Sequence, residues 1–213
     1  MSSKKEPGLK PTPEKGFSRR GFLRGAGVTS GVLGTGILTE QEAQAAQAAN
    51  LVSGETAITL NINGKATKVT VEPRTTLLDA LRDRLEMTGA KRVCDRGTCG
   101  ACTVIINGKV QYSCTVLAID AQGKKIETIE NLTAGARPHP IVPAFVNNDG
   151  MQCGYCTPGF VMAAKGFLDR NPNPTYDQVK AGLGGNLCRC GTYVGVRKAV
   201  MEAASALKGG RNA

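Results

Sequence analysis

Eight cysteines, arranged in two groups of four, are the residues of this chain best suited to do chemistry. Cysteine thiolates bind soft metal ions and iron–sulfur clusters, and cysteine thiols also pair as disulfides. Because His139 is the only histidine, the sequence excludes Cys2His2 zinc sites and clusters with two histidine ligands. The groups have the spacings C-x4-C-x2-C-x11-C and C-x2-C-x31-C-x1-C and consist of Cys94, Cys99, Cys102 and Cys114, and of Cys153, Cys156, Cys188 and Cys190.

The first group begins in a glycine-rich segment, CDRGTCGAC, that predicts a 2Fe-2S cluster. Its first three cysteines have the spacing found in plant-type ferredoxins. Gly97 and Gly100 allow backbone N–H groups to turn toward the sulfurs, where hydrogen bonds raise the reduction potential. Three basic residues, Lys91, Arg92 and Arg96, are well placed to offset the negative charge of such a cluster.

The second group fits a structural zinc site poorly, because a zinc ribbon pairs C-x2-C with another C-x2-C about 15 to 20 residues away. A helix would direct Cys188 and Cys190 to different sides. Gly184, Gly185 and Gly191 supply the backbone freedom for a turn at this point. We therefore expect Cys188 and Cys190 to lie on a turn, and the spacing alone leaves open what the second group binds, with zinc or disulfides among the interpretations.

The elements around the first group predict a small sheet. Asn63-Gly64 and Asn107-Gly108 are strong hairpin signals, and Thr76 begins a helix with four leucines on one side. The predicted strands are 55–61, 66–71, 103–106 and 110–115, with Cys114 on the last. This order of elements resembles the β-grasp fold of plant-type ferredoxins.

The elements around the second group predict four helices. A short apolar helix is expected over 141–146 and a longer one over 157–168, followed by helices that begin at Thr175 and Thr192. Thr157, Thr175 and Thr192 are interpreted as helix caps. The predicted fold class is thus α+β, with a β-grasp domain at 50–132 and a four-helix bundle domain at 133–213.

The first 49 residues have the features of an export signal. The stretch SRRGFLR, at 18–24, resembles a twin-arginine signal, and a charge-free segment at 25–39 follows it. Small-x-small cleavage sites come next, which predicts a periplasmic protein without a stable membrane span.

Length and charge exclude other classes of protein. A chain of 213 residues is too short to hold a large catalytic apparatus as well as these two cysteine domains, which favours a subunit or carrier. The net charge of +10 suggests a nucleic-acid partner, but seven of the basic residues lie within the first 45 positions and the others are dispersed. The sequence therefore does not favour nucleic-acid binding.

Three motifs resemble the small iron–sulfur subunit of the molybdenum hydroxylases, the family of xanthine dehydrogenase and aldehyde oxidase. They are CDRGTCGACTV at 94–104, GMQCGYCTPG at 150–159 and GNLCRCGTY at 185–193. The export signal makes the chain most similar to the iron–sulfur subunit of a periplasmic aldehyde oxidoreductase.

This resemblance implies that the chain does no bond-making chemistry and instead transfers electrons through two 2Fe-2S clusters. The second group would hold the cluster nearer to a molybdopterin cofactor on a large subunit, and Gln152 would hydrogen-bond the pterin. The first group would hold the outer cluster, which passes electrons to a FAD subunit or another acceptor. An apolar docking patch is expected near Gln152 and Tyr155.

The implied reaction is the oxidation of aldehydes to carboxylic acids. Two alternatives remain open at this point. One is the iron–sulfur subunit of an isoquinoline-type hydroxylase that acts on N-heteroaromatic compounds, and the other is a free-standing ferredoxin-like carrier.

Overall fold

The structure is a computed structural model that describes residues 53–135 and 137–209. The predicted export signal therefore lies outside the described residues. Within them, no helix has the length and apolar character needed to cross a membrane.

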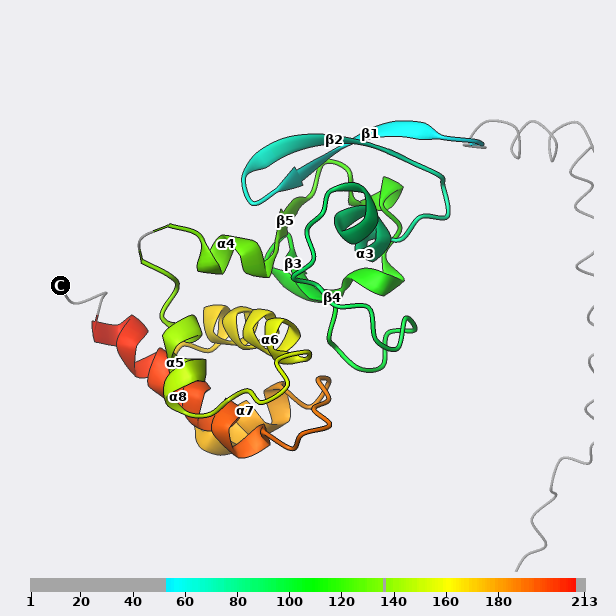
Figure 1. Ribbon diagram of the computed structural model, residues 1–213. Helices are drawn as coiled ribbons and strands as arrows, with labels where there is room; N and C mark the ends of the chain where they lie inside the picture. The colour runs from blue at the N-terminus through cyan, green and yellow to red at the C-terminus, as the bar shows by residue number, and fades with distance from the viewer. Residues whose placement is uncertain (1–52, 136, 210–213) are drawn as a thin grey trace, which may run out of the picture. The chain divides into compact units, whose positions relative to one another are not determined.

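A five-stranded mixed sheet forms the first part of the described chain (Figure 1). Its order is β2-β1-β5-β3-β4, with β1 and β5 parallel and the other neighbours antiparallel. Both predicted hairpin turns are confirmed, since Asn63, Gly64, Asn107 and Gly108 all have positive φ. The strands are β1 Thr56–Ile62, β2 Lys65–Val71, β3 Thr103–Ile106, β4 Lys109–Tyr112 and β5 Lys125–Glu127.

The helix predicted from Thr76 is present but changes its winding. Its first turn is α3, Leu77–Asp79, and a π-helical turn, Ala80–Arg84, follows. The Thr76 hydroxyl accepts a hydrogen bond from the backbone N–H of Asp79 at 3.1 Å, as a cap should. Buried leucines at 77, 78 and 81 join the apolar side chains of β1 and β2 in one core.

Five helices follow the sheet in sequence. The four predicted helices correspond to α5–α8, and the short helix α4 precedes them (Figure 1). Their bounds are α4 Ile129–Thr133, α5 Ile141–Asn147, α6 Thr157–Arg170, α7 Tyr176–Gly182 and α8 Tyr193–Gly209.

Only one of the three predicted threonine caps is confirmed. Thr175 forms a complete capping box with Gln178 at the start of α7. The prediction for Thr157 is wrong, because α6 begins at Thr157 itself and Cys156 occupies the cap position. Thr192 directly precedes α8, but its hydroxyl lies 3.1 Å from Cys188 Sγ, so it contacts a thiol in place of capping the helix.

Strand β3 joins the two halves, because both of its faces are buried. Val104 and Ile106 point into the core beneath α3, whereas Ile105 belongs to the core formed by the helices. Helix α6 lies so close to the sheet that a Cβ on Gly166 would come within 2.4 Å of Val110 Cγ2. This contact holds the helices that carry the second cysteine group against the sheet that carries the first.

An ion-pair network adds to this attachment. Lys165 on α6 has a side chain only 15 % exposed, and its Nζ lies 3.1 Å from Glu127 of β5 and 2.7 Å from Asp169. Burial alone would lower the pKa of Lys165, but hydrogen bonds to the two carboxylates raise it. The ammonium group therefore remains charged and links β5 to α6.

Candidate metal centres

The first cysteine set combines a loop before β3 with a short turn after β4. Cys94, Cys99 and Cys102 lie on the loop, and Cys114 lies on the turn. Cys94 is partly exposed, and the other three are buried. The structure therefore brings together the four residues that the spacing grouped.

The prediction that Cys114 lies on a strand is wrong. Strand β4 ends at Tyr112, and Cys114 occupies a 3-10 turn. The hairpin pairing continues one residue beyond β4, because the Ser113 backbone N–H and hydroxyl both donate to the Cys102 carbonyl, at 3.2 and 2.8 Å. This bond holds the turn of Cys114 beside the loop of Cys102.

Backbone N–H groups point at sulfur atoms in this loop, as predicted for Gly97, but the second donor is Thr98 and not Gly100. The N–H of Gly97 donates to Cys114 Sγ at 3.3 Å, and the N–H of Thr98 donates to Cys94 Sγ at 3.4 Å. Gly97 has φ +70°, a conformation that glycine adopts without strain. Burial opposes the thiolate of Cys94, but hydrogen bonds from Thr98 and from neighbouring backbone lower its pKa to about 6.

The second set lies on two turns of the helical part. Cys153 and Cys156 occupy the turn before α6, and Cys188 and Cys190 occupy the turn between α7 and α8, as predicted. Cys153 and Cys190 are exposed, whereas Cys188 is buried. This set is therefore open to an approaching molecule on the side of Cys153 and Cys190.

The buried thiol of Cys188 is surrounded by polar groups that favour its charged form. Its backbone N–H donates to the Tyr193 hydroxyl at 2.9 Å, and its sulfur contacts the Thr192 hydroxyl. Burial raises the pKa of this thiol, but hydrogen bonds with Thr192, Cys156 and the Cys190 backbone together outweigh it and bring the pKa to about 7. Burial and the neighbouring Cys188 raise the pKa of Cys156 to about 12. One thiol of this pair is thus readily deprotonated beside a protonated partner.

The eight thiols approach one another in pairs. A 2Fe-2S cluster has two irons, each bound by two of its four thiolates, so two pairs match the donor chemistry of one cluster. Among the described residues, no three or more Cys, His, Asp or Glu side chains converge in the arrangement that a single metal ion needs. The interacting pairs are Cys94 with Cys99, Cys102 with Cys114, Cys153 with Cys190, and Cys156 with Cys188.

A cavity of about 290 Å³ lies between the two sets. Two cysteines of each set line it, Cys94 and Cys99 from the first and Cys153 and Cys156 from the second. Apolar side chains make up much of the remaining wall. The two sets are therefore neighbours around a shared hollow, as two redox centres in series must be.

Two of the three basic residues predicted to offset the charge of the first cluster bond to groups outside the first set. The Arg92 guanidinium pairs with two aspartates, Asp83 at 2.7 Å among them, and these bonds raise its pKa. Lys91 donates to a backbone carbonyl of the preceding loop. Only Arg96 bonds to a residue of the set, through its Nε and the Cys94 carbonyl at 3.1 Å. The predicted charge compensation therefore has a direct structural basis at one of the three positions.

Gln152 lies in the open turn before Cys153 and is exposed. In the part of the chain that the structure describes, its side chain makes no hydrogen bond. Its amide is thus free to bind a group outside this chain, and its predicted bond to the pterin stays a prediction.

Sequence reasoning missed the contacts that hold the two sets together. The backbone N–H of Leu187 donates to the Cys99 carbonyl at 3.0 Å, and the amide of Asn186 donates to the Gly100 carbonyl at 2.9 Å. Asn186 lies within the motif GNLCRC, but no spacing rule connects it to a residue 86 positions earlier.

A β-grasp sheet attached to a helical domain, with four thiols in each, defines an iron–sulfur protein. The family descriptions that match agree with this class. A "2Fe-2S iron-sulfur cluster binding domain" matches residues 60–129 and a "[2Fe-2S] binding domain" matches residues 128–201.

Sequence comparison with known proteins narrows the class of iron–sulfur protein to one family. The chain is 45 % identical over 150 residues to a nicotinate dehydrogenase subunit of Pseudomonas putida, covering 70 % of this chain and 96 % of the relative. It is 40 % identical over 166 residues to the "Aldehyde oxidoreductase iron-sulfur-binding subunit PaoA" of Escherichia coli, covering 71 % and 72 %.

Solved structures agree. Quinoline 2-oxidoreductase of Pseudomonas putida 86 matches with a TM-score of 0.71 and 39 % identity, over 74 % of this chain and 99 % of that one. The aldehyde oxidoreductase of Desulfovibrio desulfuricans matches with a TM-score of 0.69 and 39 % identity, over 72 % of this chain but only 17 % of that one. The chain belongs to the family of 2Fe-2S subunits of the molybdenum hydroxylases.

Proposed function

We propose that this chain carries electrons from a molybdopterin centre on a large subunit to an acceptor during the oxidation of aldehydes to carboxylic acids. The observation that carries this proposal is the shared cavity with two thiols of each set in its wall. Oxidation of an aldehyde by water to the acid releases two electrons and two protons. Each bound cluster supplies a site for one electron at a time.

The cysteines of each set are proposed as the ligands of one cluster. The donor sets contain four thiols each. The backbone N–H groups of Gly97 and Thr98 donate to two of the sulfurs, and the Thr192 hydroxyl contacts a third. Hydrogen bonds and burial of this kind tune the potential of an iron–sulfur cluster. The chain's own part is thus to hold the two centres in place and to set their potentials.

The order of the two centres follows from exposure. Cys153 and Cys190 of the second set are exposed, whereas only Cys94 of the first set is partly so. Gln152 stands next to the exposed thiol of Cys153, where its amide would meet the pterin. We therefore place the second set nearest to the molybdopterin subunit, with the first set toward a FAD subunit or another acceptor.

An apolar rim around the cavity supports docking of the large subunit. Val93, Tyr155 and Leu187 line the cavity and are 55 %, 51 % and 53 % exposed. Large apolar side chains exposed together around a functional hollow mark a protein interface. In the aldehyde oxidoreductase of known structure, the matched region is 17 % of one longer chain, which agrees with a large partner here.

Replacing Tyr155 by glutamate is expected to weaken binding to the large subunit by about 30-fold, because a charge would be buried in an apolar interface. Iron content should stay as in the wild type. The measurement is the affinity of the purified chain for the co-expressed large subunit. Tyr176→Glu, at an equally large exposed side chain on α7, is the control and should bind normally. Equal binding by both variants would contradict the proposed docking face.

A second candidate substrate class is an N-heteroaromatic compound. Quinoline 2-oxidoreductase and the matched nicotinate dehydrogenase, both named for such compounds, are as similar to this chain as the aldehyde oxidoreductases are. The assembled complex should be assayed with benzaldehyde and with nicotinate. Turnover of nicotinate alone would replace the aldehyde proposal and leave the electron-transfer role unchanged.

We also propose that the protein acts in the periplasm. Support comes from the sequence SRRGFLR at 18–24 and the small-x-small sites that follow it. Twin-arginine export carries folded proteins, which suits a chain that receives its clusters before it leaves the cytoplasm. Cell fractionation of the wild type and an Arg19→Lys, Arg20→Lys variant tests this, and equal distribution of both would contradict it.

A further inference from the structure

Three consecutive residues between α7 and α8 bind to the first cysteine region. The Gly185 carbonyl accepts from the Tyr112 hydroxyl at 2.9 Å. The Asn186 side chain donates to the Gly100 carbonyl, and the Leu187 backbone N–H donates to the Cys99 carbonyl. Cys188 of the second set follows immediately.

Asn186 is the buried member of this segment. It is 5 % exposed, whereas Gly184, Gly185 and Leu187 on either side are exposed. Its amide nitrogen lies 2.9 Å from the Gly100 carbonyl oxygen and 3.4 Å from Thr103 Oγ1. A buried amide that meets its partners in this way fixes the backbone that carries it.

Gly100 shows how closely Asn186 is fitted. A Cβ on Gly100 would come within 2.5 Å of Asn186 Nδ2, so the amide occupies the space that a side chain would need. Gly100 also has φ +71°, in the region that favours glycine. The first cysteine loop is thus shaped to receive Asn186.

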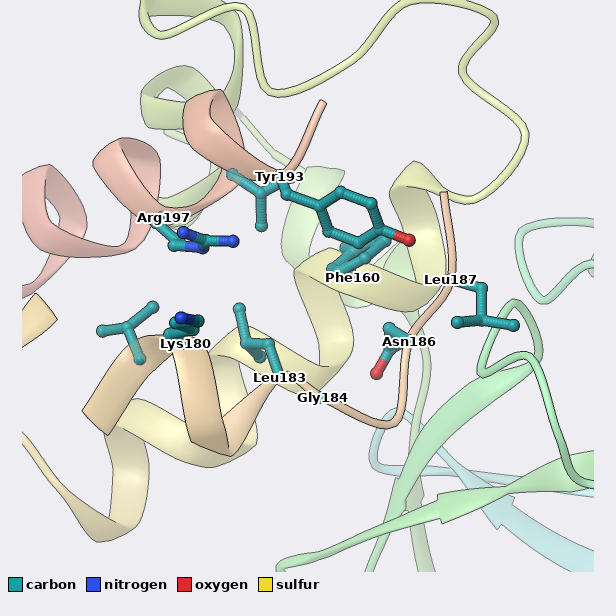
Figure 2. Close-up of a pocket in the computed structure, with 10 residues that line it drawn as sticks. Phe160, Lys180, Leu183, Gly184, Asn186, Leu187, Tyr193 and Arg197 are labelled. Atoms are coloured by element: carbon teal, nitrogen blue, oxygen red, sulfur yellow. The ribbon is translucent and has the colours of Figure 1, made fainter. Parts of the chain in front are cut away.

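Within the helical part, the segment is also held by a bond from the Asn186 backbone N–H to the Leu183 carbonyl at 3.1 Å. A hollow of about 260 Å³ lies beside it, and Asn186 and Leu187 form part of the wall (Figure 2). On the other side, Leu187 also lines the cavity between the two cysteine sets. Because hollows lie beside the segment, its hydrogen bonds to the first loop contribute much to its position.

We infer that Asn186 is a positioning residue that ties the second cysteine set to the first. It fixes the turn of Cys188 and Cys190 on the loop of Cys99 and Cys102. The second set therefore takes up its ligand arrangement only on a folded first loop, and the two centres are coupled through this amide. The cluster readouts below rest on the proposed ligands, whereas the exchange readout does not.

The test is an Asn186→Ala variant of the full chain, studied by hydrogen exchange. The Leu187 amide should exchange at least tenfold faster than in the wild type, while exchange in β1 and β2 stays unchanged. Asn173→Ala is the matched control, since Asn173 is exposed in the α6–α7 connection. Unchanged exchange at Leu187 in the Asn186 variant would overturn the inference.

Spectroscopy of the same variant separates positioning from mere stability. The two EPR signals of the reduced chain are first assigned with Cys153→Ser, which removes the centre of the second set. In Asn186→Ala, the signal of the second centre should fall at least twofold while the first signal keeps its wild-type intensity. Equal loss of both signals, or of neither, would contradict the coupling.

An isosteric variant covers a failure of Asn186→Ala to fold. Asn186→Leu keeps the branched shape of the side chain, carries no charge and cannot donate to the Gly100 carbonyl, and the same two readouts apply. If the wild-type chain itself holds no iron, the proposed function fails, yet faster exchange at Leu187 still supports the role of Asn186.

Discussion

Replacing Cys188 by serine is expected to lower the iron content of the chain from about four to about two per molecule. Serine has no thiol to act as a ligand at this buried position. The second set therefore keeps three sulfur donors and loses its cluster. The first set lies on other elements, and its EPR signal should remain. Electron transfer from the large subunit to an added acceptor should then fall by at least 100-fold. Iron and acid-labile sulfide analysis, together with EPR, checks the loss.

Thr192→Val is the matched control for this variant. It removes the hydroxyl that lies 3.1 Å from Cys188 Sγ but leaves the thiol in place. Full iron content is expected, and because a bond to sulfur is lost, the potential of the second centre should become more negative. A Cys188→Ser chain with four irons would show that Cys188 is not a ligand.

Replacing Gly159 by alanine is expected to destabilise the fold by about 3 kcal/mol, at the upper end for an overpacked core. The added Cβ would lie 2.3 Å from the Gly100 carbonyl oxygen and 2.9 Å from Ala101 Cα, and backbone atoms cannot move aside as a side chain does. Helix α6 would have to withdraw from the first cysteine loop. Thermal unfolding should show a midpoint lower by roughly 6–12 °C.

Gly209→Ala provides the comparison for this variant. Gly209 is also helical and exposed, and a Cβ there would meet no atom within 4 Å. It should leave the stability unchanged or raise it by up to about 1 kcal/mol, because alanine favours the helix. Equal midpoints for the two variants would contradict the close approach of α6 to the loop.

Local features of the fold could be predicted from the sequence. Asn63-Gly64 and Asn107-Gly108 determine the two hairpins because both residues of each turn need positive φ. The capping box at Thr175 likewise depends on residues three positions apart. In each case neighbouring residues decide the structure.

Errors arose where a distant contact overrode a local preference. Cys114 lies in a 3-10 turn and not on strand β4, and there its sulfur accepts from the Gly97 N–H, seventeen positions earlier. Thr192 resembles a cap, yet its hydroxyl contacts a thiol. Asn186 was missed altogether, since its partner Gly100 is close only in the folded chain.

The site itself was largely predictable. The spacing of the cysteines groups them as the structure places them, whereas their role as cluster ligands stays a prediction. The pairing within each set and the cavity shared by the two sets came only from the structure.

Low-temperature EPR of the dithionite-reduced full chain, with iron and acid-labile sulfide counted on the same sample, tests the central claim most directly. Electron transfer through two clusters predicts about four irons, about four sulfides and two distinct S = 1/2 signals. Protein produced together with its large subunit should be used, so that cluster insertion is complete. An EPR-silent sample that contains zinc or disulfides in place of iron would contradict electron transfer by this chain.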